Sequence, residues 1–344
     1  TWSKEKQSGA VIDAWTNITL AATCDLDGSK GSITSLFTWK DQIYCFQTKG
    51  VSTILFNSRV QIPVSDGVPI EIGNNYKVDG YKIISDGVGC DSEALVKVTS
   101  SGIYFIDSVS NHLYHIGSNI QDITTTHNMS SWFEGGNVIS RVLYDAVHKD
   151  IYLVGEEEQA LCFSEVLGQF TSFLDYGKSS LLESYDGRVF IMNNKTLYAM
   201  FEGNYNYFFT AYKPWEITFV SNGVDDHLQD FDKIFSTLDY RMDISSDGTH
   251  QPNATLDYIQ VSNEYQDTGK IDLARVKPAT TGGVHLYHKD INLRKKFRTW
   301  RIQIPRNEGS LDRIRNPWCK ITLGSTGGAN QKAILQDINV QYYV

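Results

Sequence analysis

The stretch from Asn292 to Leu323, NLRKKFRTWRIQIPRNEGSLDRIRNPWCKITL, differs from the rest of the chain in both charge and patterning. Between Lys289 and Lys320 there are ten lysine or arginine residues and three acidic ones, a local charge of +7. The whole chain carries −9, so its remainder carries −16. From Phe297 to Pro305 apolar and polar residues nearly alternate, which predicts a strand with one buried face.

The same stretch predicts a second strand and a connection rich in arginine. Pro305 is expected to end the first strand because proline cannot donate a hydrogen bond to a ladder. Asn316-Pro317 is a turn signal, and the residues from Trp318 to Leu323 read as the next strand. We interpret the pair as a basic hairpin that docks against a partner; a solvated charged hairpin is the alternative.

Two segments also resemble a known family. The sequence LRKKFRTWRIQIPR (293–306), followed by DRIRNPW (312–318), is similar to the C-terminal part of the tail stabilisation proteins of crAss-like bacteriophages, also called muzzle proteins. The segment 144–176, YDAVHKDIYLVGEEEQALCFSEVLGQFTSFLDY, resembles the same family. Together they cover about a fifth of the chain. The resemblance implies a structural virion component of the tail near the portal, without enzyme chemistry in this region.

Length and composition indicate a globular protein of two domains. The chain has 344 residues, of which 21% are charged and 41% hydrophobic, and this length favours more than one domain. The 19 tyrosines and 16 phenylalanines favour strands over helices. The net acidity argues against a chain that binds nucleic acid over its whole surface, where a basic domain is expected, but it leaves room for one local basic patch.

The cysteines and the lack of long apolar runs argue against a zinc-binding, a disulfide-rich or a membrane-spanning protein. The five cysteines are odd in number and include no CxxC pair, so we expect free, mostly buried thiols rather than a zinc site or a disulfide framework. No apolar run approaches the ~20 residues that span a bilayer, and no signal peptide is expected. The chain does not begin with methionine, so we expect a processed form or a piece of a longer protein.

A repeated pattern of short strands organises the first part of the chain. Each copy has an apolar strand, a polar turn, a strand carrying Ile-Tyr or its equivalent, and a further turn and strand. The copies occupy residues 33–56, 94–117, 141–174 and 180–203. The equivalent pairs are Ile43-Tyr44, Ile103-Tyr104, Ile151-Tyr152 and Val189-Phe190, spaced by 60, 48 and 38 residues.

Short strands repeated at such intervals predict β-propeller blades. The longer connections can hold further strands, such as Tyr76 to Ile84. Four blades do not obviously close a ring, so we expect upstream chain or a hidden blade to complete it. A set of β-meanders in another sandwich is the alternative. The WD and GH signatures are missing, so this is not a WD40 protein.

The pattern changes after Lys213-Pro214. Longer strands are expected at 215–222, 233–244, 254–266 and 333–344, with glycine-containing turns between them. This predicts an antiparallel β-sandwich. We therefore expect an all-β protein with a β-propeller-like domain at residues 1–212 and a β-sandwich with the basic hairpin at 213–344. No helix longer than two turns is expected.

Candidate catalytic motifs are weak. In a strand His285 and His288 face opposite sides, so they are not expected to share a metal. Asp225-Asp226-His227 reads as a polar turn, and Glu156-Glu157-Glu158 as a solvated edge. The nearest match to a sialidase Asp-box, at Ser245 to His250, lacks a spacer and the tryptophan, so we expect a turn. No catalytic residue, metal or cofactor is predicted.

The basic hairpin is the candidate site. Its aromatic residues alternate with basic ones and are expected to point inward, which disfavours stacking on single-stranded DNA and makes DNA contact the weaker alternative. An acidic protein surface is the expected partner, because arginine forms bidentate pairs with carboxylates. The interface candidates are Arg294, Lys295, Lys296, Arg298, Arg301, Arg306, Arg313 and Arg315, with Trp300 and Trp318 as anchors of the hairpin.

Together with the weak catalytic motifs, the family resemblance implies a non-catalytic structural protein of the phage virion. We expect it to be assembled in the bacterial cytoplasm and to stabilise the portal-proximal tail by contacting other tail proteins and copies of itself, without a membrane. Two alternatives from other classes are a glycosidase-like propeller acting on host surface glycans and a glycan-binding module without catalysis.

Overall fold

The protein is built from antiparallel sheets, and its contacts divide it into two units. The computed structural model describes residues 9, 11, 23–56, 60–62, 70–72, 78–155, 159–175, 180–209, 211–222, 231–273, 277–278, 286–287, 293–308, 310–326, 328 and 330–344. The units are Thr1–Met200 and Phe201–Val344, so the division comes earlier in the chain than Lys213. The longest α-helix in the described part of the chain has five residues, which confirms the all-β expectation.

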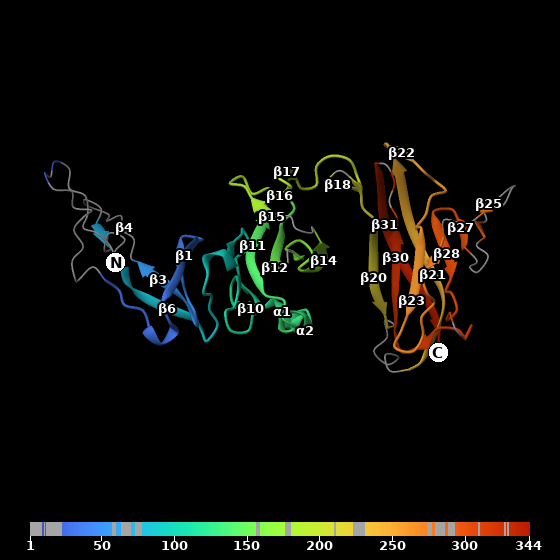
Figure 1. The fold of residues 1–344 in the computed structure, drawn as a ribbon. Coiled ribbons are helices and arrows are strands. Elements are labelled where there is room, and N and C mark those ends of the chain that lie inside the picture. Colours follow the sequence, from blue (N-terminus) through green and yellow to red (C-terminus); the bar gives the residue numbers. More distant parts are fainter. Residues whose placement is uncertain are drawn as a thin grey trace. The chain divides into compact units, whose positions relative to one another are not determined.

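The first unit contains four consecutive sheets whose strands follow chain order (Figure 1). Three of them have four strands, and the fourth sheet has three. The first sheet comprises β1 (Ile33–Trp39), β2 (Gln42–Gln47), β3 (Gly50–Phe56) and β6 (Val78–Asp86). The second comprises β7 (Val96–Val98), β8 (Ile103–Ile106), β9 (Leu113–Ile116) and β10 (Ile120–Asp122). The third comprises β11 (Ile139–Asp145), β12 (Asp150–Gly155), β13 (Gln159–Ser164) and β14 (Gln169–Asp175). The fourth comprises β15 (Ser180–Glu183), β16 (Val189–Asn193) and β17 (Thr196–Ala199).

The four predicted copies therefore correspond to these four sheets, and β6 confirms the strand expected between Tyr76 and Ile84. Three small hairpins lie outside the sheets: β4 (Val60–Ile62) with β5 (Ile70–Ile72), β18 (Tyr207–Phe208) with β19 (Ala211–Tyr212), and β25 (Lys277–Pro278) with β26 (Leu286–Tyr287). Two 3-10 turns, η2 (Gly28–Lys30) and η3 (Glu93–Leu95), precede the first and second sheets.

The first sheet packs its face against the second sheet, and the second packs its other face against the third. One core cluster joins the first and second sheets through residues such as Tyr44, Phe46 and Phe105. A second cluster joins the second and third sheets, and it includes Tyr104 and Leu153. Buried apolar residues from neighbouring sheets thus supply the hydrophobic stabilisation of this unit.

The Ile-Tyr pairs of the sequence pattern lie in the second strand of each sheet. Because successive residues of a strand point to opposite faces, the two members of a pair contact different neighbours. Ile103 packs toward the first sheet, whereas Tyr104 packs toward the third. In the second sheet the two residues of the pair therefore lie on two faces, each of which is covered by a neighbouring sheet.

Polar contacts join the first strands of successive sheets. The Lys97 ammonium on β7 lies 2.5 Å from a Glu183 carboxylate oxygen on β15. The other Glu183 oxygen accepts a hydrogen bond from the Tyr144 backbone N–H on β11, at 3.0 Å. Between the third and fourth sheets, the Ala146 N–H donates to the Gly187 carbonyl at 2.8 Å. The first strands of three successive sheets therefore converge around one carboxylate.

Two short helices follow the second sheet, α1 (Ile123–Thr126) and α2 (Ser130–Glu134). Asp122 caps α1, since its carboxylate accepts from the Thr125 N–H. Ile123 and Phe133 are buried in the core between the second and third sheets. Within the described residues there is no helix of the length and hydropathy needed to cross a membrane.

The second unit has two sheets that pack face to face around one core. The β20 sheet comprises β20 (Trp215–Ser221), β30 (Cys319–Ser325), β23 (Tyr258–Ser262) and β24 (Ile271–Asp272). The β21 sheet comprises β22 (Thr249–His250), β21 (Lys233–Ser246), β28 (Thr299–Gln303) and β27 (Leu293–Lys296), with β29 (Arg315–Asn316) and β31 (Gln331–Tyr343) also paired to β21. This two-layer packing is that of a β-sandwich.

The structure corrects the interpretation of residues 292–323 as one hairpin. Strand β28 pairs with β21 and β27, whereas β30 pairs with β20 and β23 in the other sheet. The strand predicted from Phe297 to Pro305 is shorter at both ends, since β28 covers Thr299–Gln303 and Phe297 lies in the turn that separates it from β27. The stretch therefore begins in one layer of the sandwich and ends in the other.

We expect thiol reactivity in the native protein to be confined to Cys24. The other four cysteines are buried, and desolvation raises the pKa of Cys45, Cys90 and Cys162 to about 11. Burial also raises the pKa of Cys319, to about 12. A raised pKa keeps the thiol protonated at neutral pH, and the thiolate is the nucleophile. Iodoacetamide at roughly neutral pH should label Cys24 first in the native state. All five cysteines should react after denaturation, and rapid native labelling of Cys45 would contradict this.

Candidate protein interface

Strands β27 and β28 place basic and apolar side chains on opposite faces of the β21 sheet. Leu293, Trp300 and Ile302 are buried in the sandwich core. Arg294 is paired in register with Arg301, and both are exposed on the outer face. The alternation inferred from the sequence is therefore correct for β28. It places the apolar side chains in the core and the charged side chain on the outer face.

Trp300 is a core residue and not part of an exposed interface. Its side chain is fully buried, and it lies opposite Tyr240 in the pairing of β28 with β21. The Lys295 ammonium sits 5.0 Å from the centre of the Trp300 ring, a cation–π arrangement. Desolvation lowers the pKa of Lys295, and the nearby Asp243 partly opposes that shift. Lys295 therefore covers the edge of the core, and its charge is only partly available to a partner.

Arg301 already has a carboxylate partner within the sheet. Its guanidinium donates two hydrogen bonds to Asp239, at 2.7 and 2.6 Å. The two residues face each other across β28 and β21, and these hydrogen bonds raise the pKa of Arg301. This bidentate geometry is the strong form of an arginine–carboxylate contact, so Arg301 acts first as a cross-strand tie.

The connection from β28 to β30 is anchored by apolar residues and carries three exposed arginines. Ile304 and Ile314 are buried in the core. The Arg306 guanidinium donates to the Leu311 carbonyl at 2.9 Å. Arg313 donates to the Tyr343 hydroxyl, and the Arg315 Nε lies 3.2 Å from an Asp232 carboxylate oxygen. Each of these arginines thus has a contact within its own unit and still reaches solvent.

Two aromatic residues differ from expectation. Phe297 is 88% exposed, because it occupies the turn between β27 and β28 with a φ of 56°. The expected continuous strand would have buried it. Trp318 is half-buried and lies just before β30, outside the buried core cluster among the described residues. Of the two tryptophans, Trp300 is the one that belongs to the buried core cluster.

Sequence reasoning missed the charged residues that strands β21 and β31 add to the same outer face. Arg241 is paired with Asp337, and Ser245 with Lys332. The alternation in KIFSTLDYRMDI (233–244) indicates which of its residues share a face. It does not indicate which strands pair with this one, so the shared outer face could not be predicted. We name the outer side of the β21 sheet the basic face. Its charged residues are Arg241, Arg294, Lys296, Arg298, Arg301, Lys332, Asp239, Asp243 and Asp337.

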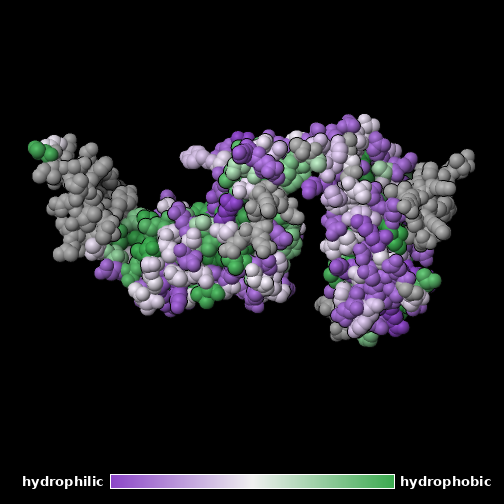
Figure 2. Space-filling view, in the orientation of Figure 1, coloured by the Kyte–Doolittle hydropathy of each residue, from purple (hydrophilic) through white to green (hydrophobic). Residues whose placement is uncertain are grey.

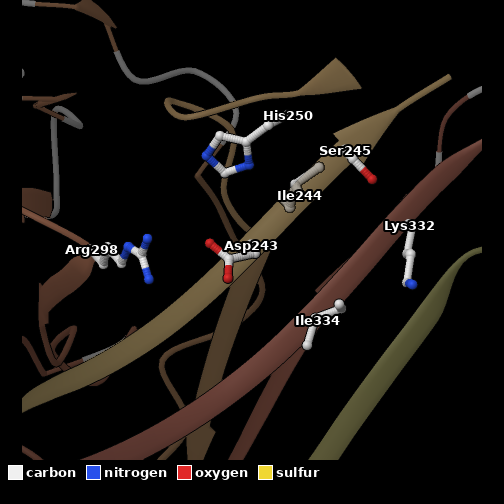
Figure 3. A pocket seen from close by; sticks show the side chains of 7 residues that line it. All are labelled: Asp243, Ile244, Ser245, His250, Arg298, Lys332 and Ile334. Atoms are coloured by element: carbon white, nitrogen blue, oxygen red, sulfur yellow. The ribbon is translucent and has the colours of Figure 1, made fainter. Parts of the chain in front are cut away.

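One end of the basic face is hollowed. A shallow depression of about 380 Å³ is lined by Asp243, His250, Arg298, Lys332 and Ile334, among others. The Asp243 side chain lies in the middle of it, between Arg298 and His250 (Figure 3). The Asp-box-like segment forms the neighbouring β21–β22 hairpin, with Asp247 and Gly248 at positive φ in its turn, as expected. Hydrophilic residues cover most of the visible side of this unit (Figure 2).

The other candidate clusters carry no assigned chemistry. Within the described ranges, no group of three or more His, Cys, Asp or Glu side chains is arranged to hold a metal ion. The segments at Glu156-Glu157-Glu158, Asp225-Asp226-His227, and His285 with His288 lie outside the described residues.

Comparison with known proteins identifies the family. Residues 1–195 match the family described as Crassvirus muzzle protein, and residues 203–307 match the Crassvirus muzzle protein C-terminal domain. The chain belongs to the muzzle protein family of crAss-like phages. It is 39% identical to the muzzle protein of Bacteroides phage crAss001 over 354 aligned residues.

The muzzle relative is a much longer protein. The alignment covers 100% of this chain but 25% of the relative. The match to the C-terminal domain begins close to the start of the second unit and extends through β28 to the first arginine of the connection. The two family matches thus follow the two units of the fold.

Proposed function

We propose that this member of the muzzle protein family is a non-catalytic structural element of the phage virion, assembled in the host cytoplasm. Its role is to stabilise the portal-proximal tail by binding neighbouring tail subunits and further copies of itself. The observation that carries the proposal is the basic face together with Arg306, Arg313 and Arg315 on the adjoining connection.

The charge distribution supports an acidic protein partner. The basic face has six cationic and three anionic side chains, whereas the whole chain has 31 basic and 40 acidic residues. An acidic surface of another subunit, including another copy of this chain, is therefore complementary to the face. Charge complementarity of this kind favours the encounter and sets the register of two subunits.

We further propose that the four sheets of the first unit are β-propeller blades. Their strands follow chain order, and the first strands of three of them meet around Glu183. In a propeller the first strand of each blade lines the central axis and the blades pack face to face. This geometry supports a structural scaffold role for the first unit.

Reversing the charges of Arg313 and Arg315 together should block incorporation into tails without unfolding the protein. Both side chains are exposed, and the Arg315–Asp232 pair is more than half exposed on both partners. An exposed pair contributes at most about 1 kcal/mol to stability. The double variant Arg313→Glu, Arg315→Glu should therefore melt close to the native temperature. Tail incorporation, followed by electron microscopy of particles, should fall strongly because arginines at an interface meet carboxylates.

The matched control is the double variant Lys149→Glu, Lys195→Glu, which makes the same change of charge at exposed turns of the first unit. It should assemble normally. A docking role is contradicted if the arginine variant folds and assembles like the control. A structural role for the arginines is indicated instead if that variant unfolds.

A further inference from the structure

The last sheet of the first unit has an apolar face that the described structure leaves open. Tyr44 and Tyr104 pack toward the following sheet. Tyr152 lies on the face opposite Ile151, which packs toward the second sheet, and all three tyrosines are buried. The equivalent residue of the fourth sheet is Phe190. Because the pattern marks a residue covered by a next sheet, Phe190 predicts a further sheet on its face.

The residues around Phe190 have the same apolar character but are exposed. Pairing of β15, β16 and β17 places Leu182, Met192 and Leu197 on the Phe190 face. Their side chains are 37%, 43% and 57% exposed. On the other face, toward the third sheet, Leu181 and Ile191 are buried. The fourth sheet is therefore built to be covered twice and is covered once.

The edge of this sheet is open as well. In the part of the chain that the structure describes, β17 pairs with β16 alone, while each of the first three sheets has a fourth strand. An unpaired apolar edge is a site for pairing with another strand. The face and the edge thus point to the same missing neighbour.

The first sheet, at the opposite end of the series, also has an apolar face that points away from its neighbouring sheet. On the side of the first sheet that points away from the second sheet lie Ile33, Leu36 and Ile83, all exposed, together with Ile43 and Ile54. Figure 2 shows apolar residues gathered where β1, β3 and β6 lie. The second sheet thus presents one apolar face to the sheet before it and another to the sheet after it, and the first and fourth sheets each have one apolar face without such a neighbour among the described residues.

We propose that the Phe190 face is covered by a further antiparallel sheet of the same full-length polypeptide, which presents an apolar face and closes the series into a ring. The inference rests on the blade interpretation, and it is independent of the docking role proposed for the basic face. A full-length polypeptide like the muzzle relative is long enough to contain a further sheet, because this chain aligns with 25% of that relative.

A second copy of the protein is the alternative cover, and symmetry disfavours it. A head-to-tail contact between the two different open faces extends into a filament unless the rotation closes, and a two-fold contact of the Phe190 face with itself leaves the open face of the first sheet uncovered. Cover by the same polypeptide depends on no particular rotation between copies. It also removes a contiguous apolar patch from a protein that must stay soluble before assembly.

The test is the accessibility of a single introduced thiol in the full-length muzzle polypeptide before it assembles. Leu197→Cys places the thiol on the Phe190 face, and Val166→Cys places one in the exposed turn after β13 as the control. Both proteins are treated with a polar maleimide, and the labelled peptides are quantified by mass spectrometry. The thiol introduced by Leu197→Cys should react about tenfold or more slowly than the thiol introduced by Val166→Cys, because a covered site reacts only after local opening.

The remaining outcomes overturn the proposal. Equal rates at the two positions would mean that the face is open in the full-length protein. Protection that disappears on dilution, with a matching change of mass in light scattering, would mean that a second copy covers it. If Leu197→Cys does not fold, Leu182→Cys on the same face replaces it with the same expected protection.

Discussion

Replacing Trp300 with alanine is expected to lower the free energy of unfolding of the second unit by about 3–5 kcal/mol. The Trp300 side chain is fully buried between the two sheets, in the same core cluster as Tyr240, Leu238 and Ile302. Truncation removes the indole from close packing and leaves a cavity that neighbouring strands cannot fill. A loss of this size is a large part of the ~5–15 kcal/mol that stabilises an ordinary domain.

Urea denaturation followed by far-ultraviolet circular dichroism measures this effect, with the second unit expected to unfold at lower urea. Phe297→Ala is the matched control, because Phe297 is three residues away and exposed at the turn. Its effect should stay within about 0.5 kcal/mol. Equal losses of stability for the two variants would contradict the prediction, because they would mean that burial in the core does not set the contribution of Trp300.

Replacing Gly89 with alanine is expected to destabilise the junction between the first and second sheets by about 3 kcal/mol or more, at the upper end of the range for overpacking. A Cβ at Gly89 would overlap the Gln47 carbonyl oxygen and the Gly50 nitrogen. These are backbone atoms, so no side-chain rotation relieves the clash. The same segment donates from the Cys90 N–H to the Gln47 carbonyl at 3.0 Å, and the Gly89 N–H donates to Asp107 at 2.9 Å.

Thermal unfolding and limited proteolysis of the purified protein measure this change, with cleavage expected first near the junction. Gly28→Ala is the control, because its Cβ would meet open space among the described residues and its backbone is not left-handed. The control should melt like the native protein. An unchanged melting temperature for Gly89→Ala would mean that the two sheets can separate there without loss of stability.

Sequence patterns predicted the positions of strands correctly where a strand buries one face or both faces. The four Ile-Tyr-type pairs lie in the second strand of four sheets, and the longer strands expected after Lys213 appear as β20, β21, β23 and β31. Burial of Trp300 and Ile302 followed from alternation. These features depend on the period of two along a strand, which a sequence displays directly.

The errors arose where pairing between distant segments decides the outcome. Phe297 fits the alternation but occupies a turn, because β27 turns back to pair with β28. The strands on either side of the arginine connection were expected to form a hairpin, yet β21 pairs with one and β20 with the other. Asp239, the partner of Arg301, lies 62 residues away in sequence.

By itself, the sequence determined that this protein is all-β, that its first part repeats a short sheet, and that one stretch concentrates positive charge. The tertiary structure decided which strands share a sheet, which arginines are tied to carboxylates, and which apolar residues of the described sheets are exposed. The physical reason is that side-chain alternation and turn chemistry are local, whereas strand pairing and sheet packing depend on contacts between residues far apart in the chain.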